Sequence, residues 1–159
     1  MSQDNYSLVQ ANFAYWKDDV PSIFMQSFIG QANAIHELVE KSPGFVWRYS
    51  SDDVVDMHVA KIFGSKKIIF NMSVWHSLED LKSFSFTGIH LSAMKQKTDW
   101  FDEIRGRGSV LWWIDKSKTP TVEQAKEKLD LLAEKGPTVD AFTFGKLFEP
   151  ISQNDEVLG

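Results

Sequence analysis

The eight residues Ile68–Trp75, Ile-Ile-Phe-Asn-Met-Ser-Val-Trp, constrain the fold more than any other stretch of the chain. This short β-branched and aromatic run, flanked by helix signals, predicts a strand. Alternate residues point to opposite faces, and both sets are largely apolar, so neither face should meet bulk water. One set also carries Asn71 and Ser73. Neighbours or a ligand must satisfy these two side chains, since a buried unsatisfied polar group costs about 1–3 kcal/mol.

The other elements are predicted from periodicity and capping signals. Alternation predicts strands over 8–15, 45–49 and 109–114 and a short edge strand over 58–63, with a loop bracketed by Gly106 and Gly108. Helices are predicted from Pro21 to Ser42, from Ser77 with a break at Thr87–Gly88 and a resumption over 89–97, and from Thr121 to Gly136. This order is that of a ferredoxin-like α+β unit, with a four-stranded antiparallel sheet whose first and third strands lie in the middle.

The second face of the predicted sheet needs a cover of its own. The helices of a ferredoxin-like unit cover one face, yet apolar residues occur on both faces of Ile68–Trp75. A second copy of the chain is the economical cover, so we predict a homodimer in which two sheets form a barrel-like core. One domain is expected over 1–159, with its core at about 8–148.

Composition excludes several classes of function. A formal net charge of −5 without a long Lys/Arg block indicates no nucleic-acid or membrane partner. The chain has no cysteine, which excludes disulfides, thiolate metal sites and cysteine nucleophiles. The N-terminus is polar and no apolar run approaches the length of a membrane span, so a cytoplasmic location is expected. No nucleophile, phosphate-loop, dinucleotide or paired-carboxylate motif is present.

Several motifs together resemble a known family. They are Ser42-Pro-Gly-Phe-Val-Trp-Arg48, Asn71-Met-Ser-Val-Trp75, His90, Trp100-Phe101, Val110-Leu-Trp-Trp113, Pro120-Thr-Val-Glu-Gln-Ala125, Gly136-Pro-Thr138 and Ala141-Phe-Thr-Phe144. The set, which runs from about Leu8 to Phe148, resembles a domain-of-unknown-function family of dimeric α+β barrels. That family is similar in fold to the antibiotic-biosynthesis monooxygenases and more distantly to spheroidene monooxygenase, a haem enzyme. The resemblance implies a monooxygenase-like fold.

His90 is the candidate catalytic residue, because a helical wheel places it partly inward beside Phe86 and Met94. The alternative is a core histidine that is hydrogen-bonded to a carbonyl group or a tryptophan. The distant resemblance to a haem enzyme makes His90 a conceivable axial ligand, but Thr87-Gly88 replaces the Arg-Ser expected of the family. No cofactor is therefore expected. No metal is expected either, since His58 and its neighbouring aspartates match no ligand spacing.

Polar residues on the predicted strands are the candidate ligand-binding residues, together with nearby aromatic residues. The set is Asn12, Arg48, Asn71, Ser73, Trp100, Phe101 and Trp113, with Gln10 as a further polar strand residue. If the polar groups share a face, they outline a mostly apolar pocket with a few placed polar groups, the usual form of a small-molecule site. The alternatives are a buried network that only specifies the dimer and aromatic residues that are simply core. The strand register decides between them and cannot be read from the sequence.

Two classes of function follow from these expectations. The first is a protein of monooxygenase-like fold that binds a small apolar or aromatic molecule between sheet and helices, with cofactor-free oxidation as a further step. The second is a non-enzymatic dimeric binding or structural module, and a haem-dependent monooxygenase ranks below both. Fold alone does not choose between them, because one scaffold hosts many functions.

Overall fold

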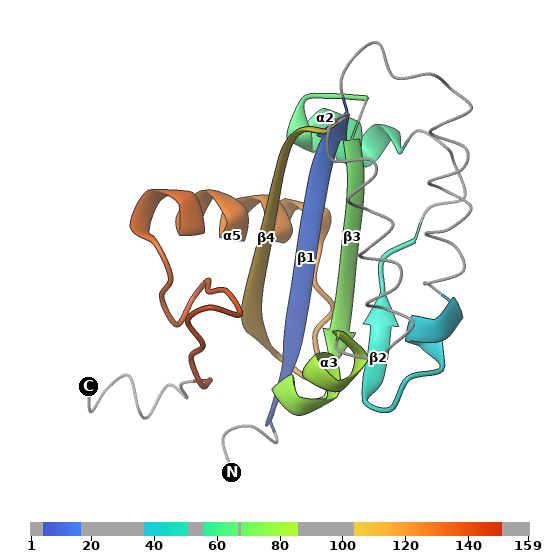
Figure 1. The fold of residues 1–159 in the computed structure, drawn as a ribbon, viewed down its shortest axis with the longest axis vertical. Coiled ribbons are helices and arrows are strands. Elements are labelled where there is room, and N and C mark those ends of the chain that lie inside the picture. Colours follow the sequence, from blue (N-terminus) through green and yellow to red (C-terminus); the bar gives the residue numbers. More distant parts are fainter. Residues whose placement is uncertain (1–4, 17–36, 51–55, 67, 86–103, 151–159) are drawn as a thin grey trace.

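A computed structural model describes residues 5–16, 37–50, 56–66, 68–85 and 104–150 (Figure 1). Its strands are β1 (Tyr6–Trp16), β2 (Phe45–Arg48), β3 (Ile68–Trp75) and β4 (Ile104–Asp115), and its helices are α2 (Met57–Phe63), α3 (Leu78–Ser85) and α5 (Val122–Lys135). The strands form one antiparallel sheet in the order β2-β3-β1-β4. The predicted fold class is thus confirmed, with β1 and β3, which correspond to the strands predicted over 8–15 and 68–75, in the middle of the sheet.

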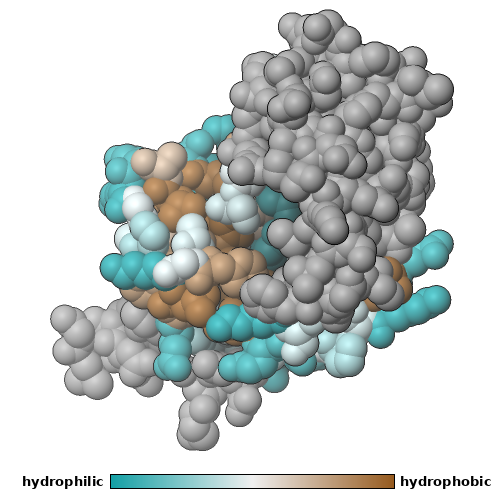
Figure 2. Space-filling model, viewed as in Figure 1, coloured by the Kyte–Doolittle hydropathy of each residue, from teal (hydrophilic) through white to brown (hydrophobic). Residues whose placement is uncertain are grey.

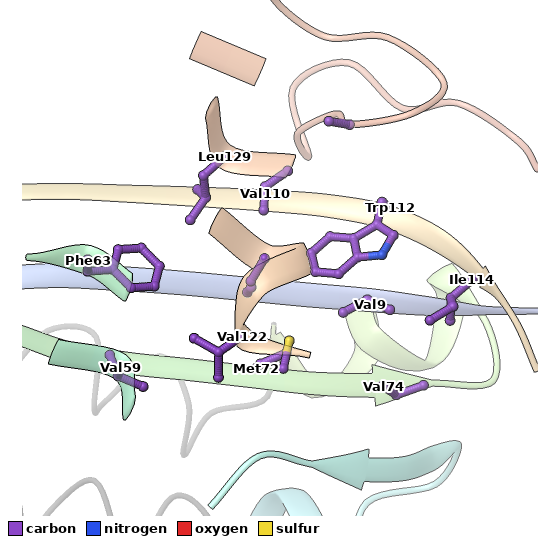
Figure 3. Close-up of a cluster of buried hydrophobic side chains, with 13 residues drawn as sticks. Val9, Val59, Phe63, Met72, Val74, Val110, Trp112, Ile114, Val122 and Leu129 are labelled. Atoms are coloured by element: carbon purple, nitrogen blue, oxygen red, sulfur yellow. The ribbon is translucent and has the colours of Figure 1, made fainter. Parts of the chain in front are cut away.

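One face of the sheet, here called the Val9 face, packs against α2 and α5. Figure 3 shows strand side chains and helix side chains meeting in a single cluster, whose central members are at most 9% exposed. The cluster includes Val9, Met72, Val74, Val110 and Trp112 from the strands, Val59 and Phe63 from α2, and Val122, Ala125 and Leu129 from α5. The Val9 face is therefore a closed hydrophobic core within one chain.

The helix α2 replaces the edge strand that was predicted over 58–63. The Asp56 side chain accepts a hydrogen bond from the Val59 backbone N–H at 3.0 Å and so caps the helix, which ends at Gly64 with φ 78°. Val59, Ala60 and Phe63 then lie on the buried side of the helix. Because α2 and α5 cover the Val9 face, the face no longer requires a second copy. The homodimer stays a prediction, but the need to cover this face of the sheet no longer supports it.

The strand β4 is longer than predicted. The sequence predicted a loop at Gly106 and Gly108, but both residues lie inside β4 and pair with β1. Gly108 pairs with Phe13, and a Cβ atom built on Gly108 would lie 2.6 Å from the Phe13 ring. The glycine therefore serves the close approach of an aromatic ring to a strand, and it does not form a turn.

The opposite face of the sheet, here called the Leu8 face, packs against α3 and the C-terminal segment. Its buried cluster comprises Leu8, Val39, Trp75, Leu81, Leu111 and Phe142. The backbone of Phe142 pairs with Leu111 of β4 through N···O distances of 2.8 and 2.9 Å, which adds a short pairing at the edge of the sheet. The capping box predicted at Thr121 with Gln124 is confirmed. At Ser77 the N-cap half is present, because Ser77 Oγ accepts from the Asp80 N–H, and Ser77 Oγ donates in turn to Asp80 Oδ2.

The hydrogen bond between Tyr49, just after β2, and Asp56, the N-cap of α2, predicts a pH-dependent stability. The Tyr49 hydroxyl donates to Asp56 Oδ2 at 2.5 Å, and desolvation followed by this hydrogen bond raises the pKa of Tyr49 to about 12. A raised pKa means that the protonated phenol favours the folded state, so its contribution is complete below pH 10.0 and is lost as the pH rises through about 12. The difference in Tm between wild type and Tyr49→Phe should shrink over this interval. A difference in Tm that stays constant over this pH interval would contradict the hydrogen bond between Tyr49 and Asp56.

Candidate functional site

Four polar side chains from the two middle strands meet on the Leu8 face and are called here the polar row: Gln10, Asn12, Asn71 and Ser73. Asn12 pairs with Asn71 across β1 and β3, and Gln10 pairs with Ser73. Directly paired residues project to the same face, so the register answers the question that the sequence left open. The predicted polar residues of these strands do share a face.

Hydrogen bonds link the polar row in pairs. Asn71 Nδ2 donates to Asn12 Oδ1 at 3.2 Å, and Ser73 Oγ lies 3.5 Å from Gln10 Oε1, at the long limit of such a bond. Trp75 Nε1 donates to Ser73 Oγ at 2.9 Å and so fixes that hydroxyl from two positions further along β3. All four side chains of the row are half-buried. The row is an ordered polar strip with access to solvent.

A β-bulge places Arg48 beside the polar row. Phe45 pairs with Trp75 and Trp47 with Val74, so two steps along β2 match one step along β3, and Arg48 then pairs with Ser73. Trp47 and Tyr49, by contrast, pack against the Val9-face cluster. Arg48 therefore lies on the opposite face of the sheet from Trp47 and Tyr49. Bulges re-aim the side chains of the bulged strand, and this one places Arg48 directly opposite Ser73 of the row.

The guanidinium of Arg48 donates hydrogen bonds to two oxygen atoms. Its Nε donates to Glu40 Oε1 at 2.8 Å, and its Nη1 donates to the Tyr49 carbonyl at 3.3 Å. The Arg48 side chain is 22% exposed, whereas Glu40 is 49% exposed. Sequence reasoning missed Glu40 because it lies on the segment before β2, eight positions from Arg48, where no periodicity relates the two.

Aromatic side chains border the row at the end nearest Leu8. Trp75 is 1% exposed and packs against the rings of Phe45 and Phe84, with ring centroids 5.9 and 5.4 Å apart. Trp113 pairs with Leu8, and its Nε1 donates to the Phe148 carbonyl at 2.8 Å. Hydrophobic residues also gather on the surface at the side of β4 and α5 (Figure 2). The polar row is thus set among largely apolar groups.

Some predicted site residues fall outside the described part of the chain. His90, Trp100 and Phe101 lie there, as do Thr87 and Gly88, so the predictions for His90 stay predictions. His58 is described, and its Nε2 lies 3.3 Å from Glu123 Oε1 in a largely exposed pair. Within the residues that the structure describes, no three histidine or carboxylate side chains form a group that could hold a metal. No helix in the same residues is long and apolar enough to cross a membrane.

Fold and register together define an α+β protein of ferredoxin-like fold with a polar row on one face of its sheet. The chain belongs to the family described as "Domain of unknown function (DUF3291)", whose model matches residues 7–157. This match confirms the resemblance found in the sequence motifs. No curated protein matches the chain.

Several solved structures are similar to this chain at low sequence identity. A conserved protein from Methanosarcina mazei Go1 has a TM-score of 0.50 and 9% identity, over 71% of this chain and 95% of that chain. A variant of SnoaB, a cofactor-independent oxygenase from Streptomyces nogalater, has a TM-score of 0.48 and 10% identity, over 72% and 98%. A dimeric ferredoxin-like protein of unknown function from Thermobifida fusca has a TM-score of 0.48 and 10% identity, over 69% and 92%.

The Asn12–Asn71 pair predicts a coupling that a double-mutant cycle measures. Either single replacement, Asn12→Leu or Asn71→Leu, leaves one half-buried amide without this partner and should lower the free energy of unfolding by about 1–2 kcal/mol. The double variant removes both amides, so its loss should be about 1 kcal/mol smaller than the sum of the single losses. Urea unfolding of the four proteins gives these values. Strictly additive losses would show that the amides do not interact in solution.

Proposed function

We propose that this chain binds a small apolar or aromatic molecule that carries a polar group, with the polar row as its anchoring surface. The observation that carries the proposal is the register, which aligns Gln10 with Ser73 and Asn12 with Asn71 on one face beside buried aromatic residues. A few placed polar groups in apolar surroundings are what orient a small ligand.

The polar row has hydrogen-bonding capacity to spare. An amide side chain offers two donors and two acceptor positions. Among the described residues, Asn12 accepts one hydrogen bond through Oδ1 and Gln10 accepts one through Oε1, and neither amide nitrogen donates to another described group. Both side chains are half-buried. A ligand hydroxyl or carbonyl group would use donors that otherwise depend on water.

A purely structural network is the competing account of the same residues. Such a network gains stability when its members satisfy one another fully, because a partly satisfied buried network costs more than apolar packing does. The 3.5 Å separation between Ser73 Oγ and Gln10 Oε1 is at the weak limit, and the amide nitrogens of Gln10 and Asn12 donate to no described group. These features favour a surface that receives a ligand.

Cofactor-free oxidation of the bound molecule is the finer part of the proposal. The described polar row contributes amides and a hydroxyl, which hold a substrate oxygen atom and stabilise negative charge that develops on it. These groups take no proton near neutral pH. Oxygen consumption in the presence of the bound molecule tests this step separately from binding.

Binding is tested by native mass spectrometry of the purified protein and by titration with naphthol, a neutral aromatic molecule with one hydroxyl group. We expect a retained small molecule or saturable naphthol binding, weakened about three- to tenfold in Asn12→Leu/Asn71→Leu, since a neutral hydrogen bond contributes about 0.5–1.5 kcal/mol. Asn5→Leu, the same replacement at an exposed position just before β1, is the matched control. Equal naphthol affinity in all three proteins, with no retained molecule, would reject the site.

A further inference from the structure

We infer that the ligand of the polar row carries an anionic group, such as a carboxylate, and that Arg48 selects for it at the β2 end of the row. The inference rests on the proposed function and adds the charge of the ligand to it. Its basis is the bulge that pairs Arg48 with Ser73, together with the incomplete use of the guanidinium.

The guanidinium of Arg48 has an open edge. A guanidinium carries five N–H groups in a planar fork and stays charged at all relevant pH values. In the described structure one N–H meets Glu40 through Nε and one meets the Tyr49 carbonyl through Nη1. The contact with Glu40 involves only one carboxylate oxygen. The guanidinium can therefore still form the bidentate pair of hydrogen bonds that arginine prefers with a carboxylate.

Unequal exposure leaves a net attraction for anions. Glu40 is 49% exposed, so water and salt screen its charge more than they screen that of Arg48, which is 22% exposed. The four side chains of the polar row itself are neutral, and the nearest of them to Arg48 along the sheet is Ser73. Arg48 is paired with Ser73 on the face of these neutral groups, and three of its five N–H groups meet no described partner. An aromatic acid matches this pattern.

Paired probes test the inference in the full chain: naphthol and naphthoate, which share a ring system and differ in their neutral or anionic group. We expect wild type to bind naphthoate about tenfold more tightly than naphthol, because a charge-assisted hydrogen bond from a guanidinium is about twice as strong as a neutral one. Arg48→Gln should abolish this preference, and Arg48→Lys should restore only part of it. Glu40→Gln should raise naphthoate affinity about two- to fivefold and leave naphthol affinity unchanged.

The controls separate this inference from the proposed function. Lys118→Gln changes the net charge by the same amount at an exposed site and should leave the naphthoate preference unchanged. If Arg48→Gln keeps the wild-type preference while Asn12→Leu/Asn71→Leu still weakens naphthol, the anion inference is wrong and the site stands. If neither probe responds to the Asn12→Leu/Asn71→Leu replacement, both ideas fail. Circular dichroism melts confirm that each variant is folded before its affinity is compared.

Discussion

Replacing Gly44 by alanine should lower the free energy of unfolding by about 3 kcal/mol. Gly44 has φ 81°, and a left-handed conformation costs a non-glycine residue about 1–2 kcal/mol. A Cβ atom at this position would also collide with the side chain of Asp80 in α3, and overpacking adds about 1–3 kcal/mol. The Gly44 carbonyl accepts the His76 N–H at 2.8 Å, so this turn joins the start of β2 to the end of β3.

Gly64 supplies a matched control for this prediction. It has a similar φ of 78°, but a Cβ atom there would meet nothing within 4 Å. Gly64→Ala should therefore show only the conformational cost of about 1–2 kcal/mol. Chemical denaturation of both variants gives the comparison. Equal losses would mean that α3 does not press against Gly44 in the folded protein.

Replacing Trp75 by alanine should lower the free energy of unfolding by about 3–5 kcal/mol, the usual range for a buried tryptophan. Trp75 is 1% exposed and fills the space between β3, Phe45 and Phe84. The replacement also removes the hydrogen bond that holds Ser73 Oγ. We therefore expect weaker naphthol binding in any Trp75→Ala protein that remains folded.

Trp75→Phe separates packing from hydrogen bonding. Phenylalanine retains an aromatic ring but has no N–H group. The Trp75→Phe protein should therefore lose much less stability than Trp75→Ala, although Ser73 Oγ loses its donor in both. Thermal unfolding and naphthol titration of the two variants provide the test. A phenylalanine variant as unstable as the alanine variant would show that the indole N–H bond, and not packing, dominates at this position.

The strands and capped helices could be predicted from the sequence because their signals are local. The alternation over Ile68–Trp75 and the Thr121–Gln124 capping box both gave elements that the structure contains. The prediction of a strand over 58–63 was wrong because six residues are too few to distinguish a strand pattern from one face of a helix. Its signal lay outside the segment, in the Asp56 cap and in Gly64. Gly108 was mistaken for a loop signal because the Phe13 ring opposite it is distant in sequence.

The residue types of the candidate site were visible in the sequence, but their arrangement was not. Asn12 and Asn71 come together only through the pairing of β1 with β3, which a one-residue shift would undo. The position of Arg48 depends on a bulge, and its pairing with Glu40 depends on the turn at Gly44. Such long-range geometry is set by packing, and local sequence patterns carry no record of it.

Ligand binding by the polar row is tested most directly by proton–nitrogen correlation NMR of the side-chain amides. Titration with naphthol should shift the side-chain NH2 signals of Gln10, Asn12 and Asn71 along one saturation curve. The signals of Asn5 and Gln124, which lie off the row, should stay in place. If naphthol binds and the three amides of the row keep their positions, the ligand site lies elsewhere and the account is wrong.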